Sequence, residues 1–453
     1  VSLDNHKEGD LSPYLFKSID LGESWESISN NIPDRTLVWR FVQDHVKKDL
    51  FFLATEFGIY TSLNAGGNWQ KLPGSPTISF RDIVIQEGEN DLVGASFGRG
   101  FFVLDDYSAL REMTPENLSK KGKLFKPRDA KLFKPRNSLG NTGGQFYTAK
   151  NPEYGAVFTY NLNSVPKTSK SLRMQRERRL NTDNKDIPFP GYDKLSDEMN
   201  EKPASIILTI KDSDGNHIRN VKKNASNGSS RIAWNLRHQS YYPIRAGRGQ
   251  VNSWFNPSGP YVTPGEYHAE IYLENNGSVE KLDGPIAFNV KPLRKGTLEG
   301  ASYSEYNSFR TRVSNLYVAM SKYQDEFNMM KSKIELLDKA SLQLETFSPE
   351  IMKKISDFKA KYNAFDSEIG SNPARDEIGE WDKPTISMRV QIAMQGLSTS
   401  YGPTDLNKSN LDIAERLFEN LATDVKEFKS ELESLENEVK ELNPPHLSGT
   451  GIN

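Results

Sequence analysis

The sequence contains no cysteine, which excludes disulfide bonds, thiol nucleophiles and cysteine-ligated metal sites together. Its six histidines show no His-x-x-x-His pattern or similar ligand spacing, so the sequence offers no zinc site. No arrangement of residues singles out a serine nucleophile. We therefore predict a chain without a metal centre or a bound cofactor.

Long hydrophobic runs and an excess of one charge are missing as well. No apolar stretch approaches the ~20 residues of a membrane-spanning helix. The 58 basic and 60 acidic side chains leave a net charge of -2, which gives no reason to expect nucleic acid or an acidic polymer as partner. The length of 453 residues corresponds to about three domains.

A short turn motif occurs twice, at residues 18–25 and 62–69. A short polar side chain can hydrogen-bond nearby backbone N–H groups, Gly can adopt a positive φ, and Trp can fold back as an apolar plug. The residues are Ser18, Asp20, Gly22 and Trp25 in the first copy and Ser62, Asn64, Gly66 and Trp69 in the second. Because periods of ~40 to 50 residues are typical of stacked or radial repeats, we interpret these turns as structural.

The repeat extends beyond the turn. Residues 49–60 align with residues 91–102, and both segments show Asp-Leu, an apolar run, Gly and an apolar pair. Each segment is predicted to form two strands joined by a tight turn. At 104–107 the turn motif has lost its Gly and Trp. Residues 1–112 therefore hold roughly two repeats and the start of a third.

The two turns resemble the Asp-box (BNR) pattern Ser-x-Asp-x-Gly-x-Thr-Trp, with Asn64 in place of Asp and with Ser24 and Asn68 in place of Thr. Residues 90–106 are similar to the closing blade of a large bacterial group of sortilin-like BNR-repeat proteins, often labelled "glycosyl hydrolase". The usual order of that group is a β-propeller, an immunoglobulin-like sandwich and a helical tail. The resemblance would cover the whole chain.

A propeller needs at least four blades of four strands, and residues 1–112 supply fewer. We expect them to be the last blades of a propeller whose other blades lie upstream. On this interpretation the chain is the C-terminal portion of a longer protein.

Residues 113–149 are predicted to be an extended linker. Leu-Phe-Lys-Pro-Arg occurs at 124–128 and again at 132–136, and its prolines disfavour helix and central strand. We expect this linker to lie along the propeller with its Leu and Phe side chains docked. The alternative is a basic strap that docks an acidic partner.

Residues 150–292 are predicted to form an immunoglobulin-like or fibronectin-like β-sandwich, because six short segments alternate apolar and polar side chains. Two long insertions interrupt it. The basic insertion, 164–203, is predicted to be a solvated loop. The aromatic insertion, 240–260, is predicted to pack against a neighbouring domain or to bind a partner through Tyr241, Tyr242, Trp254 and Phe255.

Residues 293–453 change to a helical period and are predicted to form an antiparallel bundle of four helices. The first helix carries an apolar stripe from Tyr306 to Leu337. Ser348-Pro349-Glu350 is a start signal for the second helix, and Gly402-Pro403-Thr404 precedes the fourth. The third is expected at about 385–398. The fold class is therefore mainly β followed by α.

Few residues are candidates for chemistry. Residues 212–216 resemble the start of a calcium loop, but His217 and Lys223 stand where Gly and Glu are needed, so a hairpin is the better interpretation. Glu56, Asp105 and Asp106 lie near strand ends and are the candidate glycosidase acids, although a turn-capping role is favoured for each. Arg99, between two glycines, could bind a carboxylate or could join two blades.

These observations favour a non-catalytic binding or scaffold protein of the bacterial cell envelope, exported and part of a larger outer-membrane-associated assembly. Sortilin-type propellers bind polypeptides, so the resemblance implies a protein or peptide partner, with outer-membrane proteins among the candidates. The alternative is a secreted glycoside hydrolase, with carbohydrate as ligand and an active site in propeller blades outside this chain.

Overall fold

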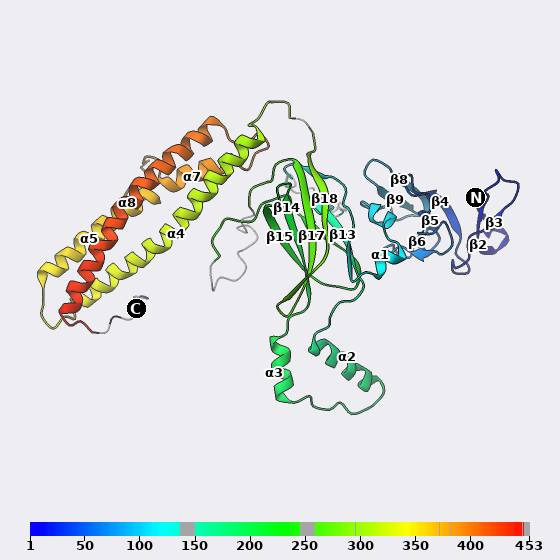
Figure 1. Ribbon diagram of the computed structural model, residues 1–453, viewed down its shortest axis with the longest axis horizontal. Helices are drawn as coiled ribbons and strands as arrows, with labels where there is room; N and C mark the ends of the chain where they lie inside the picture. The colour runs from blue at the N-terminus through cyan, green and yellow to red at the C-terminus, as the bar shows by residue number, and fades with distance from the viewer. Residues whose placement is uncertain are drawn as a thin grey trace. The chain divides into compact units, whose positions relative to one another are not determined.

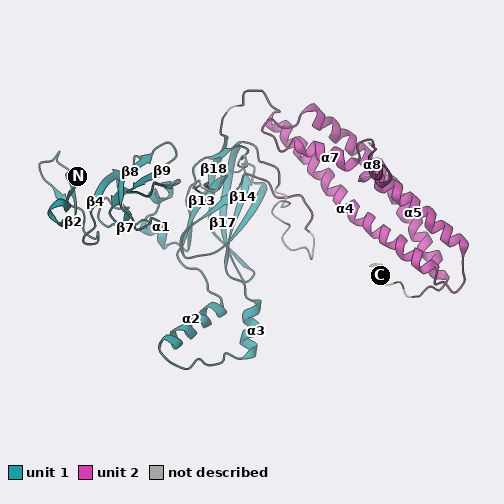
Figure 2. Cartoon of the chain, turned by 180° about the vertical axis from the view of Figure 1, so that it is seen from behind, with its two compact units in different colours: residues 1–236, 264–292 teal, residues 237–263, 293–453 magenta. Residues whose placement is uncertain are grey.

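The computed structural model describes residues 1–135, 149, 151–244, 259–294, 296–370, 372–380, 382–445 and 447. The chain forms two compact units, which Figure 2 shows in different colours. The first comprises residues 1–236 and 264–292 and holds the β-sheets. The second comprises residues 237–263 and 293–453 and holds the long helices.

Three antiparallel sheets form the N-terminal part of the first unit (Figure 1). Neighbouring strands in each sheet are consecutive in the chain. The first sheet has β1 (Ser2–Asn5), β2 (Asp10–Lys17) and β3 (Glu26–Ser27). The second has β4 (Val38–Gln43), β5 (Phe51–Thr55), β6 (Gly58–Ser62) and β7 (Gln70–Lys71), and the third has β8 (Phe80–Gln86), β9 (Asp91–Ser96) and β10 (Phe101–Leu104).

Strand β5 explains why these sheets stack. Successive side chains of a strand point to opposite faces of its sheet. Phe51 and Leu53 share a core with Leu15 of β2, whereas Phe52 shares a core with Phe80 of β8. The second sheet therefore lies between the first and the third, and β5 and β6 are buried along their whole length.

The predicted strand pairs are confirmed. Residues 49–60 contain most of the β5–β6 hairpin and residues 91–102 most of the β9–β10 hairpin, both antiparallel. The first strands of the two sheets also correspond, because β4 and β8 each shift register against the next strand at their second residue. After β10 the chain turns into the 3-10 helix η2 (Ser108–Arg111).

The described residues 113–135 differ from the linker predicted over 113–149. They contain α1 (Pro115–Ser119) and two strands, β11 (Gly122–Leu124) and β12 (Ala130–Leu132), which join the two sheets that follow. Each copy of Leu-Phe-Lys-Pro-Arg ends a strand at its Leu. Its proline lies beyond the strand, where no ladder hydrogen bond is required. The prolines therefore terminate strands here rather than prevent them.

The predicted sandwich is present as two sheets packed face to face. One has the order β11-β13-β16 and the other β12-β18-β17-β14-β15, in which β12 alone is parallel to its neighbour. Aromatic rings meet between the sheets, with ring centroids 5.1 Å apart for Phe158 and Phe288. The remaining strands are β13 (Ala156–Leu162), β14 (Ser205–Asp212), β15 (His217–Asn224), β16 (Gly228–Trp234), β17 (Gly265–Asn275) and β18 (Ser278–Pro292).

The basic insertion is not a solvated loop. It forms two helices, α2 (Ser169–Thr182) and α3 (Tyr192–Asn200), between β13 and β14. Thr168 starts α2 by accepting a hydrogen bond from the N–H of Ser171. The Arg, Leu, Met and Gln residues that follow have high helix propensity, and this outweighs the polar composition on which the loop prediction rested.

The second unit confirms the predicted helices and adds a short one. Ser348 caps its helix as predicted, and Thr404 caps the fourth, each by accepting a backbone N–H three residues on. One core joins the four main helices. The helices are α4 (Tyr303–Ser341), α5 (Pro349–Ile369), the short α6 (Pro373–Glu377), α7 (Ile386–Gln395) and α8 (Asp405–Glu441). None of the helices described combines the length and the apolarity that crossing a bilayer requires.

Candidate functional site

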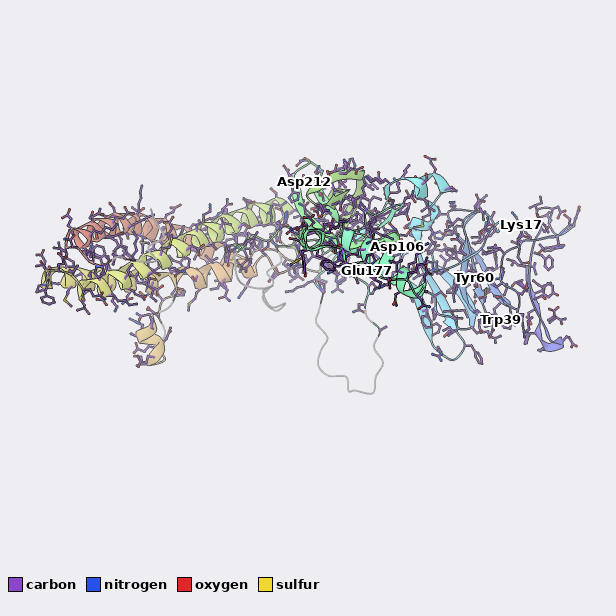
Figure 3. The ribbon with its side chains drawn as sticks, turned by 90° about the horizontal axis from the view of Figure 1, so that it is seen from below. Lys17, Trp39, Tyr60, Asp106, Glu177 and Asp212 are labelled. Carbon is purple, nitrogen blue, oxygen red and sulfur yellow. The ribbon has the colours of Figure 1, made fainter. Side chains whose placement is uncertain are left out.

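The strand ends of the second and third sheets bring a tryptophan and an arginine together. Trp39 in β4 and Arg81 in β8 stand at the equivalent register shifts of the two first strands. A residue at such a shift is released from regular pairing, so its side chain can be re-aimed. Figure 3 labels Trp39 among the side chains of this region.

Arg81 lies between two aromatic rings. Its guanidinium carbon is 3.7 Å from the centre of the Trp39 ring and 5.3 Å from that of Phe97, at the end of β9. His6 meets the Trp39 ring edge-on, with centroids 5.4 Å apart. The arrangement is a cation–π sandwich that restricts the side chain of Arg81.

Glu56, in the β5–β6 turn, fixes the position of this sandwich. Its Oε2 atom accepts hydrogen bonds of 2.9 Å from Trp39 Nε1 and of 2.9 Å from Ser79 Oγ. Arg81 Nη2 is 3.8 Å from the same oxygen. The carboxylate thus orients the indole and balances part of the charge of the guanidinium.

Exposed groups extend the site along the β9–β10 hairpin. Arg99 is exposed at its tip, between Gly98 and Gly100, whose positive φ angles of 76° and 74° glycine adopts without strain. In the part of the chain that the structure describes, the Arg99 side chain makes no hydrogen bond or ion pair, so it does not join two blades. Phe101 is 78% exposed. We call Trp39, Arg81, Phe97 and Arg99 the arginine–aromatic surface.

Two of the predicted glycosidase acids, Glu56 and Asp106, have structural partners. Glu56 serves the Trp39–Arg81 contact. Asp106 caps a turn, because its Oδ1 accepts hydrogen bonds from the N–H and the hydroxyl of Ser108, while its own N–H binds Asp91. The Arg81 guanidinium beside two aromatic rings and the exposed Arg99 suit the binding of a carboxylate on a partner rather than proton transfer.

One serine does stand in a Gly-x-Ser-x-Gly string, Gly94-Ala95-Ser96-Phe97-Gly98, beside the arginine–aromatic surface. Nucleophilic serines of this pattern stand on a turn between a strand and a helix. Ser96 instead ends strand β9, and its hydroxyl donates a 2.8 Å hydrogen bond to the carbonyl oxygen of Gly100. This serine therefore shapes the hairpin.

The two predicted turns have the same geometry. Ser18 Oγ accepts the N–H of Gly22 at 2.8 Å, and Asp20 Oδ1 accepts the N–H of Ser24 at 3.0 Å. In the second copy the same contacts run from Gly66 to Ser62 at 2.9 Å and from Asn68 to Asn64 at 2.9 Å. Each of these hydrogen bonds joins two residues of the same turn, which supports the interpretation of both turns as structural.

The structure describes only two of the four aromatic residues predicted to bind through the aromatic insertion, Tyr241 and Tyr242. Tyr241 and Tyr242 stack on each other, and both rings contact Tyr317 of α4. Tyr241 meets the Tyr317 ring edge-on at a centroid distance of 5.3 Å, and Tyr242 meets it at a tilt at 4.7 Å. Burial raises the pKa of Tyr241. These two tyrosines thus cover the helices of their own unit. Trp254 and Phe255 lie outside the described residues.

The calcium-like loop is a hairpin turn. Asp212 Oδ1 accepts hydrogen bonds from the N–H groups of Asp214, at 3.1 Å, and Asn216, at 2.8 Å, between β14 and β15. The carboxylate is therefore turned toward the backbone rather than toward a cation. Among the residues that the structure describes, no group of three His, Asp or Glu side chains could hold a metal ion.

The sequence predicted Arg99 and Glu56 as candidates but missed Trp39 and Arg81. One signal could have identified them. Trp39 and Arg81 are separated by the same interval as the two Asp-Leu segments, so extending that alignment upstream would have placed them at equivalent positions. Their contact with each other depends on how the sheets stack, which the alignment does not contain.

Comparison with known proteins leaves the family of this chain open. No protein-family model and no curated protein matches the sequence significantly. Among solved structures, the extracellular domain of a protein described as a one-component system from B. thetaiotaomicron matches with 12% identity and a TM-score of 0.18. The match covers 65% of this chain and 31% of the other, so the chain spans about a third of that structure.

Proposed function

We propose that the three N-terminal sheets are consecutive blades of an Asp-box propeller of the sortilin-like BNR type. The equivalent register shifts of β4 and β8 support a common blade plan. So does the sharing of β5 side chains between the cores on its two faces. The immunoglobulin-like sandwich and the helical bundle are then the accessory domains of the same protein.

The open sides of the three-sheet stack support this proposal. In the second sheet, Ile59 of β6 is 5% exposed, whereas Phe101, at the equivalent place in β10, is 78% exposed. On the opposite side, Trp25 lines a cavity of about 320 Å³ with Val1, Leu3 and Phe16. In a propeller each of these apolar sides is covered by a further blade.

We further propose that the chain is an exported, non-catalytic binding or scaffold protein of the bacterial cell envelope, and that its arginine–aromatic surface contacts a protein or peptide partner. The observation that carries this is the Trp39–Arg81–Phe97 sandwich. A restricted guanidinium between the half-buried Trp39 ring and the exposed Phe97 ring is pre-organised for a carboxylate, so little conformational entropy is lost when a partner binds. Arginine and aromatic residues are also enriched in protein interfaces.

The test uses arrayed acidic, neutral and basic peptides with the full chain. We expect acidic peptides to bind, and Arg81→Ala, Phe97→Ala and Arg99→Ala each to weaken binding of the best peptide by roughly tenfold. Arg416→Ala, an exposed arginine on α8, is the matched control and should leave binding unchanged. Equal binding of acidic and basic peptides, or no effect of Arg81→Ala, would contradict the proposal.

The same protein is incubated with a panel of glycans, because the hydrolase alternative predicts release of reducing ends. Glu56→Gln is the informative variant. Its carboxylate is the candidate glycosidase acid that contacts the arginine–aromatic surface, and Gln keeps an oxygen that can accept the hydrogen bond of Trp39. Release that disappears with Glu56→Gln would replace the scaffold proposal by the hydrolase.

A further inference from the structure

The helices α2 and α3 form an arm to which the proposed function assigns no role. They are inserted between two strands of the sandwich sheets and project from one end of those sheets in both views of the ribbon (Figures 1 and 2). Neither helix buries a single side chain. We call residues 169–200 the helical arm.

Ion pairs between the two helices hold the arm together. Arg173 of α2 contacts Glu177 of its own helix at 2.8 Å and Glu198 of α3 at 2.8 Å. At the base, the backbone N–H and the hydroxyl of Ser169 each donate a 2.6 Å hydrogen bond to the carboxylate of Glu201. The arm is therefore a defined helical hairpin with fixed outer faces.

The two helices carry opposite charge. Helix α2 has five basic residues and one acidic residue, whereas α3 has three acidic residues and one basic residue. The contacts inside the arm use only some of these charges. The guanidinium groups of Arg176, Arg178 and Arg179 and the carboxylates of Asp193 and Asp197 are exposed, and no hydrogen bond or ion pair within the described ranges engages them.

Apolar side chains accompany these charges. On α3, Tyr192 is 81% exposed and Met199 is 87% exposed, two turns apart on one side of the helix. Phe189 meets the Tyr192 ring edge-on, with centroids 5.1 Å apart. On α2, Leu172 and Met174 are exposed. An amphipathic helix normally buries such a row against another element.

We propose that the helical arm pairs with the arm of a second copy of this chain, with the basic α2 of one copy against the acidic α3 of the other. A two-fold axis makes each of these contacts twice, so both helices of both arms find a partner of opposite charge. The exposed Tyr192 and Met199 are covered in the same contact. The resulting four-helix cluster is small, so its formation depends on protein concentration and on salt.

The charge pattern favours a second copy over a membrane or a nucleic acid. An anionic surface would attract α2 but repel Asp193 and Asp197 on the adjoining α3. The complementary surface must present an acidic row beside a basic row. The arm itself is such a surface, because it carries the two rows side by side.

The test measures the mass of the full chain by sedimentation equilibrium between 1 and 100 µM, at low and at high salt. We expect the mass at low salt to rise from 51.2 kDa toward twice that value, and to fall back at high salt. Arg178→Glu/Arg179→Glu and Asp193→Arg/Asp197→Arg should each weaken self-association by roughly tenfold or more, because like charges then face each other. An equimolar mixture of the two double variants should associate again.

The mixture separates a direct pairing from a folding defect, since two misfolded arms would not restore each other. Circular dichroism of each variant serves as the folding control. A chain that stays at 51.2 kDa at 100 µM in low salt, or a mixture that fails to associate, overturns the proposal. So does a monomer that sediments with phosphatidylglycerol vesicles but not with phosphatidylcholine vesicles, because the arm would then bind an anionic membrane.

Discussion

The indole Nε1 of Trp69 donates a 2.7 Å hydrogen bond to the carbonyl oxygen of Ile28. Asn31 adds two bonds to the same tryptophan, accepting its backbone N–H at 2.7 Å and donating to its carbonyl oxygen at 2.7 Å. The side chain of Trp69 is 2% exposed. The second turn therefore attaches its sheet to the preceding one, whereas Trp25 bonds only within its own turn, to Gly22.

Removal of the two tryptophans should have unequal effects. We expect Trp69→Ala to lower the free energy of unfolding of the first unit by about 3–5 kcal/mol, because it removes a fully buried ring and leaves a cavity. Because Trp25 is 51% exposed, Trp25→Ala should lower the same free energy of unfolding by less than about 1 kcal/mol. Urea denaturation followed by circular dichroism measures both. Equal losses would mean that Trp69 does not hold the sheets together.

The acceptor oxygen, rather than the charge, should decide the stability of the turns. Asn64 Oδ1 accepts from Ser62 Oγ and from the N–H of Asn68, and Asp20 does the same in the first copy. We therefore expect Asn64→Asp to change the free energy of unfolding by less than about 0.5 kcal/mol and Asn64→Ala to lower it by about 1–2 kcal/mol. Thermal unfolding of the pair of variants tests this, and a large loss in Asn64→Asp would contradict it.

Features with short-range causes could be predicted from the sequence. The two repeated turns, the cap at Ser348 and the cap at Thr404 each depend on residues within a few positions, so a single stretch of chain contains the whole signal. The Trp39–Arg81 contact joins residues of two sheets, and its geometry follows from how the sheets stack. No local pattern encodes that distance.

The helical arm was missed for a different reason. Its helices are polar on most sides and bury nothing, so the hydrophobic period that identifies a buried helix is weak in α2. Propensity and the Thr168 cap were the only signals. The strands at 122–124 and 130–132 were missed because proline was interpreted as a strand breaker, although each proline lies after its strand.

A buried carboxylate joins the β4–β5 turn to η2. Asp44 accepts two hydrogen bonds of 2.8 Å from Arg111, one of 2.6 Å from the hydroxyl of Tyr107 and one of 2.6 Å from the N–H of Lys47. Burial acts to raise the pKa of Asp44, but these donors outweigh it and hold the pKa well below its usual range. Asp44 is thus an anion that its surroundings fully satisfy.

Asp44→Asn should destabilise the first unit by about 3–5 kcal/mol, because it leaves Arg111 charged, largely buried and without its carboxylate. The matched control is Asp82→Asn, whose partner Arg40 is 3.4 Å away and exposed, and there we expect a change within about 0.5 kcal/mol. Urea denaturation compares the two. The single variant Arg111→Met and the double variant Asp44→Asn/Arg111→Met complete the comparison. We expect the double variant to lose less free energy of unfolding than the two single variants together, and strict additivity would show that the pair is not coupled.

Glu270 in β17 should make the sandwich sensitive to acid. Its buried carboxylate lies 2.8 Å from Lys211 Nζ and 2.6 Å from Lys281 Nζ, and it accepts a 2.9 Å hydrogen bond from Tyr272. Burial acts to raise the pKa, but the hydrogen bonds from these three side chains lower it from 4.5 to about 2. The charged form is therefore favoured in the folded protein.

Because the folded pKa is depressed, the stabilising contribution of Glu270 is complete above pH 4.5, where the carboxylate is ionised in both the folded and the unfolded chain. As the pH falls from 4.5 toward 2, the unfolded chain takes up the proton first and the contribution is lost. We expect Glu270→Gln to be less stable than the wild type at pH 6, and the gap to narrow steadily between pH 5 and pH 3. Urea midpoints across this range measure it. A gap that does not change with pH would show that packing of the side chain, and not its ionisation, stabilises the sheet.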